Sequence, residues 1–195
     1  MPLTTIQTLS DGLRLGLWNI TEKVTDLPCP TCLDLSSINS DTRKIERLVT
    51  YQLLNALTGL DQVEIKHDKA GKPLIDGYEI SLSHTRGWAA MIISEHYQTG
   101  IDVEYISDRV NRVASRFIRS DEDCEGLEKR LVNWCAKEAL YKMRSAEDLQ
   151  YFDMRLHPFS LSDGFVNTDD LKRGDTVRID FEHNADYVLT WCAEP

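Results

Sequence analysis

The residues of this chain best suited to chemistry lie in two short segments. Residues 99–104 (Thr-Gly-Ile-Asp-Val-Glu) alternate as a strand does, so their two carboxylates share one face. Residues 134–142 (Trp-Cys-Ala-Lys-Glu-Ala-Leu-Tyr-Lys) are typical of a helix, in which the glutamate and the last lysine lie one turn apart. If the helix packs against the strand, three carboxylates and one ammonium converge: Asp102, Glu104, Glu138 and Lys142.

Such a group of side chains suits a magnesium ion and a phosphate. Mg²⁺ prefers hard oxygen ligands and often takes phosphate oxygens as further ligands, and a lysine offers phosphate a mobile positive charge. Each segment alone has a simpler explanation. A D-x-E strand pair is usually a solvated face, and a Glu–Lys pair one turn apart is usually a surface salt bridge. Their occurrence together favours a site.

The hydrophobic pattern predicts the elements that position these residues. Apolar residues at helical spacing predict helices at 41–57, 108–118 and 127–143. Short alternating or apolar runs between turn residues predict strands at 13–20, 63–66, 78–83, 88–94, 99–104, 159–165, 176–181 and 187–192. The chain is therefore expected to hold two successive groups of antiparallel strands packed with helices, which is an α+β organisation.

Further motifs occur in a fixed order before the two segments: Gly71-Lys72-Pro73, then Ile80-Ser81-Leu82-Ser83-His84-Thr85, then an apolar run from Trp88. The whole set resembles the 4′-phosphopantetheinyl transferase superfamily, and within it the larger, pseudo-dimeric type that activates peptide and polyketide synthases. The small trimeric type carries its first aspartate motif near the N-terminus, whereas here it lies mid-chain. Relatives often have Asn where this chain has Ser81, a difference that affects a supporting hydrogen bond.

The resemblance implies a fold and a reaction. The fold would be two similar lobes related by a pseudo-twofold axis, each an antiparallel sheet packed with helices. Residues 1–106 would form the N-terminal lobe and residues 107–195 the C-terminal lobe of one compact, monomeric catalytic unit. The enzyme would transfer the 4′-phosphopantetheine group of coenzyme A to a serine of an apo acyl or peptidyl carrier protein, release 3′,5′-ADP and depend on Mg²⁺.

The resemblance also implies roles for the acidic residues and for one lysine. Asp102, Glu104 and Glu138 match the acidic positions that bind Mg²⁺ in relatives, and Lys142 matches the lysine that contacts the pyrophosphate. A metal and a lysine would stabilise the charge that develops on the phosphoryl oxygens. Glu138 is the candidate general base for the carrier-protein serine, with a metal-bound water as the alternative.

Coenzyme A contacts are expected from three residues outside those two segments. His84 lies at a strand end and is expected to contact a phosphate, although a lone histidine is more often structural. Lys72 would lie against the nucleotide end. Arg43 would reach the 3′-phosphate, but the nearby Lys44 and Arg47 are equally placed by helix register.

The charge of the chain bears on its partners. A formal net charge of −10 argues against nucleic-acid binding, and an acidic carrier protein would need a local basic patch. Four arginines recur at i, i+3, i+7 and i+10 on a predicted helix face, where they form either a docking surface for the carrier protein or a solvated face: Arg109, Arg112, Arg116 and Arg119.

Other functions and locations have weaker support. Another Mg²⁺-dependent phosphoryl or nucleotidyl enzyme would need a phosphate-binding Gly-rich loop, and no G-x-x-x-x-G-K-S/T occurs. An inactive coenzyme A-binding relative is the non-enzymatic alternative. Cys29 and Cys32 form a CxxC without a second pair, which favours reduced thiols over zinc or redox chemistry. We expect a cytoplasmic protein without a membrane span, because residues 1–5 do not begin a signal peptide.

Overall fold

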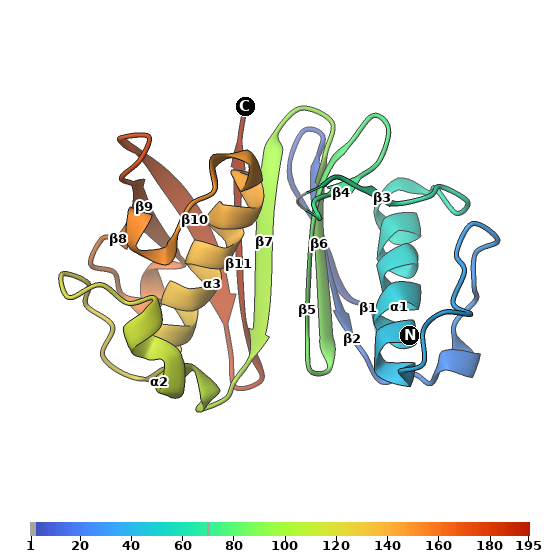
Figure 1. The fold of residues 1–195 in the computed structure, drawn as a ribbon, viewed down its shortest axis with the longest axis horizontal. Coiled ribbons are helices and arrows are strands. Elements are labelled where there is room, and N and C mark those ends of the chain that lie inside the picture. Colours follow the sequence, from blue (N-terminus) through green and yellow to red (C-terminus); the bar gives the residue numbers. More distant parts are fainter. Residues whose placement is uncertain (1–2, 70) are drawn as a thin grey trace.

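The computed structural model describes residues 3–69 and 71–195. Residues 1 and 2, which belong to the segment 1–5 considered above for a signal peptide, lie outside the described residues. The fold is α+β, with two antiparallel sheets, each packed against one long helix (Figure 1). The four-stranded sheet has the order β1 (Leu3–Ser10), β2 (Leu13–Asn19), β6 (Trp88–Ser94), β5 (Glu79–Thr85). The five-stranded sheet has the order β7 (Gln98–Tyr105), β11 (Tyr187–Glu194), β10 (Asp175–His183), β9 (Phe165–Asp170), β8 (Met154–Leu156).

The remaining elements connect or cover these sheets. A small hairpin pairs β3 (Lys66–His67) with β4 (Pro73–Leu74). The helices are α1 (Asp41–Thr58), α2 (Arg109–Val113) and α3 (Leu127–Met143). Short 3₁₀ turns are η1 (Val24–Asp26), η2 (Ala114–Arg116), η3 (Ser145–Glu147), η4 (Tyr151–Asp153) and η5 (Leu161–Asp163). No helix in the described residues is long and apolar enough to cross a membrane.

The alternation of side chains along the strands produces a layered core. On β2, Leu13, Leu15 and Leu17 face the other sheet, whereas Trp18 faces α1. Inward residues of β7 and β11 complete the central layer, so the order of layers is α1, four-stranded sheet, five-stranded sheet, α3 (Figure 1). The two sheets therefore bury apolar residues on both faces, as strands between two layers must.

The two lobes repeat one connectivity. In the first lobe, β2 leads to α1 and then to β5 and β6, and β6 pairs between β2 and β5. In the second lobe, β7 leads through α3 to β10 and β11, and β11 pairs between β7 and β10. Because β7 is hydrogen bonded to β11, residues 98–105 belong to the five-stranded sheet. The predicted division of the chain at residue 106 stays a prediction.

Both long helices agree with the predicted ranges, but the predicted helix at 108–118 is wrong in its second half. Regular α-helix ends at Val113, and a 3₁₀ turn follows. Phe117, just beyond that turn, is fully buried, and its carbonyl accepts a 2.7 Å hydrogen bond from the Lys137 ammonium of α3. The pattern of a single element does not reveal this tertiary contact.

The predicted strand at 159–165 is also wrong, because that segment holds the 3₁₀ turn η5. Ser160 caps the turn, since its hydroxyl accepts from the Ser162 amide while the Asp163 carboxylate accepts from the Ser160 amide at 2.8 Å. The predicted strand at 63–66 is placed later, at 66–67, and β1 and β8 were not predicted. These are short or edge segments, in which the hydrophobic signal is weak.

Candidate active site

The two lobes meet along β5 and β7, where side-chain hydroxyls of one strand hold the other. Ser81 Oγ accepts a hydrogen bond from the Ile101 amide at 3.2 Å, Ser83 Oγ donates to Asp102 Oδ1 at 2.7 Å, and Thr85 Oγ1 donates to Glu104 Oε2 at 2.7 Å. The three hydroxyls alternate along β5 and therefore face β7 together. Ser81, at the position where relatives often have Asn, supplies one of these contacts.

The first part of the predicted convergence is an ion pair between β7 and α3. Lys142 Nζ lies 2.6 Å from Asp102 Oδ1 and donates to the Ile101 carbonyl at 3.0 Å. Asp102 is only 5% exposed, and its second oxygen, Oδ2, is buried without a hydrogen-bond partner among the described residues. A buried carboxylate oxygen without a partner is costly, so this oxygen is a ready ligand for a cation.

The other two carboxylates occupy half-buried positions on either side. Glu104 accepts its hydrogen bond from Thr85, and burial, together with the charge of Asp102, raises the pKa of Glu104 above its ordinary value. Glu138 accepts a 2.6 Å hydrogen bond from the Tyr151 hydroxyl, and burial raises its pKa as well. Two carboxylates with raised pKa values beside the buried Asp102 mark a place where a divalent cation would offset negative charge.

Nevertheless, the predicted metal ligands do not form a closed coordination site. Nowhere in residues 3–69 and 71–195 do three His, Cys, Asp or Glu side chains lie close enough together to hold an ion as they stand. Each carboxylate is instead hydrogen bonded to a neighbour: Ser83 and Lys142 for Asp102, Thr85 for Glu104, and Tyr151 for Glu138. The chemistry of the donors, with the unpartnered Asp102 Oδ2, fits Mg²⁺.

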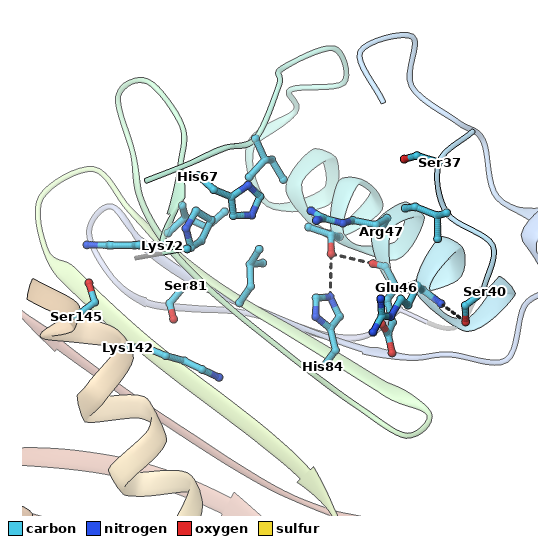
Figure 2. A pocket seen from close by; sticks show the side chains of 18 of the residues that line it. Ser37, Ser40, Glu46, Arg47, His67, Lys72, Ser81, His84, Lys142 and Ser145 are labelled. Carbon is cyan, nitrogen blue, oxygen red and sulfur yellow. Dashed lines mark hydrogen bonds between the residues drawn. The ribbon is translucent and has the colours of Figure 1, made fainter. Parts of the chain in front are cut away.

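A cavity of about 840 Å³ lies on the N-terminal side of this cluster, between α1, β5 and the end of α3 (Figure 2). Its walls carry most of the basic residues that the sequence analysis proposed for coenzyme A: Arg43, Arg47, Lys72, His84 and Lys142. Lys44, which was the third alternative on α1, does not line it. The cavity therefore suits a ligand with several anionic groups.

Local structure fixes the position of these cationic residues. Ser40 is the N-cap of α1, and its hydroxyl accepts from the Arg43 amide, so Arg43 lies in the first helical turn and Arg47 one turn later. Lys72 follows Gly71, whose φ of 87° suits glycine, and its ammonium forms a 2.9 Å ion pair with Glu79. The hairpin of β3 and β4 thus places Lys72 at the edge of the cavity, with its side chain extending away from Arg47 and His84 (Figure 2).

His84 projects into the cavity from β5, on the opposite face from Ser83 and Thr85. Its Nε2 lies 2.8 Å from the Thr50 hydroxyl of α1 (Figure 2). Desolvation of the ring between the cavity walls, followed by the charges of Lys142 and Arg47, lowers the pKa of His84 to about 4, although one side of the residue stays open to the cavity. A neutral imidazole near neutral pH can either donate or accept a hydrogen bond.

This low pKa predicts a measurable response to an anion. In the free protein, the NMR signals of the His84 ring are expected to titrate well below pH 6.5, near pH 4. Because a bound phosphate stabilises the protonated ring, adding 3′,5′-ADP should raise that midpoint. The spectrum of a His84→Gln variant assigns the signal, and a midpoint that 3′,5′-ADP leaves unchanged would exclude a phosphate contact.

A second, smaller pocket of about 320 Å³ lies on the other side of the carboxylates. Glu104 and Trp134 contribute to it, as do Arg86 and Arg109, and the rest of its lining includes the apolar residues Val110, Val113 and Leu131.

The four predicted arginines do not lie along one helix face, because α2 ends at Val113. Arg112 and Arg116 are exposed, but Arg119 is drawn away, since it forms an ion pair with Asp121 and donates to the Phe152 carbonyl.

Three residues of the cluster were not selected from the sequence. Ser83 and Thr85 were quoted only as part of the histidine motif, yet their spacing at i and i+2 with Ser81 is a visible sign of one polar strand face. Tyr151 carries no such sign, because it approaches Glu138 from a 3₁₀ turn beyond the end of α3.

Comparison with known families agrees with this arrangement. Residues 98–192 match the 4′-phosphopantetheinyl transferase superfamily. The matched segment runs from β7 through α3 into β11, so it contains all three carboxylates and Lys142. The lobe that precedes it is consistent with the larger type of that superfamily, whose members are generally transferases. No curated protein matches the chain significantly.

Proposed function

We propose that this protein transfers the 4′-phosphopantetheine group of coenzyme A to a serine of an apo carrier protein. The observation that carries the proposal is that the cationic cavity opens onto the Asp102–Lys142 ion pair, beside two further carboxylates. A multiply phosphorylated nucleotide in the cavity would place its pyrophosphate at Lys142, which belongs to both features. The superfamily match of residues 98–192 supports the same reaction.

In the proposed reaction the serine Oγ attacks the β-phosphorus of coenzyme A. A P–O bond to the serine forms, the bond between the β-phosphorus and the bridging pyrophosphate oxygen breaks, and 3′,5′-ADP leaves with that oxygen. Lys142 would stabilise charge on the pyrophosphate oxygens. Asp102, Glu104 and Glu138 would hold Mg²⁺, which when bound supplies positive charge to the phosphoryl oxygens. Glu138 would accept the serine proton, with a metal-bound water as the alternative base.

Coenzyme A would be held by the cationic wall of the cavity. His84 would contact a phosphate, Lys72 the nucleotide end, and Arg43 the 3′-phosphate. Arg47 lies one turn from Arg43 on the same wall, so both arginines could bind that dianion. Guanidinium groups bind phosphate with paired hydrogen bonds, which gives them an advantage over Lys44 in this role.

The direct test is to incubate the protein with coenzyme A, Mg²⁺ and apo carrier proteins from fatty-acid, peptide and polyketide synthesis. Mass spectrometry should detect phosphopantetheine added to the acceptor serine, and an acceptor Ser→Ala carrier should stay unmodified. Binding of coenzyme A by calorimetry without modification of any carrier would support the inactive, coenzyme A-binding alternative instead.

The carrier protein would dock on the basic side of the second pocket. If coenzyme A fills the cavity, the acceptor serine must approach the carboxylates from the opposite side, where Arg86 and Arg109 flank Glu104. Arg112 and Arg116 are exposed nearby on α2 and η2. The proposed docking residues are therefore Arg109, Arg112 and Arg116, and Arg119 would take part only if its ion pair with Asp121 opened.

Reversing two of these charges should weaken carrier binding alone. We expect Arg112→Glu with Arg116→Glu to raise the Michaelis constant for an acidic carrier protein about tenfold or more at low salt and to leave that for coenzyme A nearly unchanged. The matched control is Arg173→Glu with Arg178→Glu, which alters two exposed arginines of the β9–β10 hairpin. Equal carrier kinetics in the two double variants would refute docking at α2.

A further inference from the structure

Glu138 is not a free carboxylate in this fold. Tyr151 donates a 2.6 Å hydrogen bond to its Oε1 from η4, which lies beyond the end of α3. Neutral and charged hydrogen bonds of this length are among the stronger ones in proteins. This hydrogen bond orients the carboxylate, and Oε2 is the oxygen that takes no part in it.

The position of Tyr151 is itself fixed by a group of three aromatic rings. Its ring centroid lies 5.3 Å from that of Trp134 and 6.4 Å from that of Phe117, and the last two rings lie 5.1 Å apart, edge to face. Trp134 precedes Glu138 by one helical turn. Rings at these separations and angles attract one another and resist rotation, so the hydroxyl of Tyr151 has a defined direction.

The aromatic group is in turn anchored to α3 by a buried ion pair. Lys137, the residue before Glu138, is fully buried, and its ammonium donates to the Phe117 carbonyl at 2.7 Å and lies 2.9 Å from Glu122. Glu122 also accepts from the Leu156 amide of β8, at 2.8 Å, just beyond η4. The Lys137 ammonium therefore connects α3 to two segments. It binds the segment that holds Phe117 directly, and it binds β8, which follows Tyr151, through Glu122.

We infer that Tyr151 is a positioning residue that fixes the Glu138 carboxylate so that a single oxygen, Oε2, faces the reacting centre. The identity of the reacting centre rests on the proposed function, whereas the hydrogen bond between Tyr151 and Glu138 is observed in the structure. Glu138 would then be a one-oxygen ligand or base, held in one rotamer before substrate arrives. Partners of this kind behind a metal ligand often contribute 10–100-fold to metal affinity or activity.

The test is Tyr151→Phe, which removes the hydroxyl and keeps the ring. The matched control is Tyr187→Phe, since Tyr187 is also packed against an aromatic ring, that of Trp88, and also donates to a glutamate, Glu182, at 2.8 Å. Two quantities are measured for wild type and both variants: the affinity for Mn²⁺ by electron paramagnetic resonance in the presence of coenzyme A, and kcat with the Michaelis constant for coenzyme A.

Tyr151→Phe is expected to lower the Mn²⁺ affinity and kcat by about tenfold or more, while the Michaelis constant for coenzyme A and the behaviour of Tyr187→Phe stay close to wild type. The inference is overturned if Tyr151→Phe matches Tyr187→Phe in Mn²⁺ affinity, or if the wild-type protein binds no Mn²⁺. A Tyr151-dependent Mn²⁺ affinity in a protein that modifies no carrier would retain the inference and refute the proposed function.

Discussion

Replacing Asp102 with asparagine is expected to lower transfer by about 10³-fold or more, the largest loss that a single isosteric change should produce here. The asparagine amide can still accept from Ser83, which now contacts Oδ1 at 2.7 Å. It cannot carry the charge that pairs with Lys142 at 2.6 Å, and its neutral oxygen is a weaker ligand for Mg²⁺ than the buried, unpartnered Asp102 Oδ2.

The fold should survive this substitution. Lys142 loses an ion pair, but a quarter of its side chain is exposed and can be hydrated. We expect the free energy of unfolding to fall by about 1.5–3 kcal/mol, the usual contribution of a hydrogen bond to a charged group. Asp180→Asn, at an ion pair of β10, is the control for loss of a surface carboxylate. A fully active Asp102→Asn enzyme, or one indifferent to a chelator, would refute the role of Asp102.

Gly100→Ala is expected to have the second largest effect, through packing. A Cβ atom at Gly100 would overlap the carbonyl oxygen of Ala139 and lie 2.9 Å from the carbonyl carbon, so the helix backbone of α3 must move away from β7. Glu138 and Lys142 would move with it, away from Asp102. We expect activity to fall about 10²-fold, because misplacement by about 1 Å can cost that much, and stability to fall by about 1–3 kcal/mol.

Gly16 provides the matched control for this change. It occupies β2, where an added Cβ would lie 2.9 Å from Leu53 Cδ2, the end of a flexible side chain of α1. Gly16→Ala should therefore cost less stability and leave transfer near the wild-type rate. Activity that falls equally in the two variants would show that general loosening, and not the distance between α3 and β7, causes the effect. Thermal unfolding and the mass-spectrometric transfer assay measure the two quantities.

Local periodicity was sufficient to predict the two long helices, but it did not by itself predict that α3 packs against β7. The pair Asp102 and Lys142 follows from one strand face and one helix face, so their meeting required a single assumption about packing. The hydrogen bond from Tyr151 to Glu138 could not be predicted in this way, because Tyr151 reaches Glu138 from a 3₁₀ turn beyond α3 and its ring packs against Phe117 from another segment. That Arg43 lines the cavity and Lys44 does not could likewise not be predicted, because it depends on which face α1 turns toward β5.

The repeated connectivity of the lobes coexists with a single reactive centre. Gly16 on β2 and Gly100 on β7 occupy equivalent places beneath α1 and α3, yet two residues further on the first lobe has Trp18 and the second has Asp102. Trp18 packs into the core beside α1, whereas Asp102 meets Lys142. The two lobes therefore contribute different parts of the proposed site: the first supplies most of the lining of the cavity, and the second supplies the three carboxylates. Neither lobe alone would hold both parts, so the proposed chemistry requires the two lobes to be docked against each other.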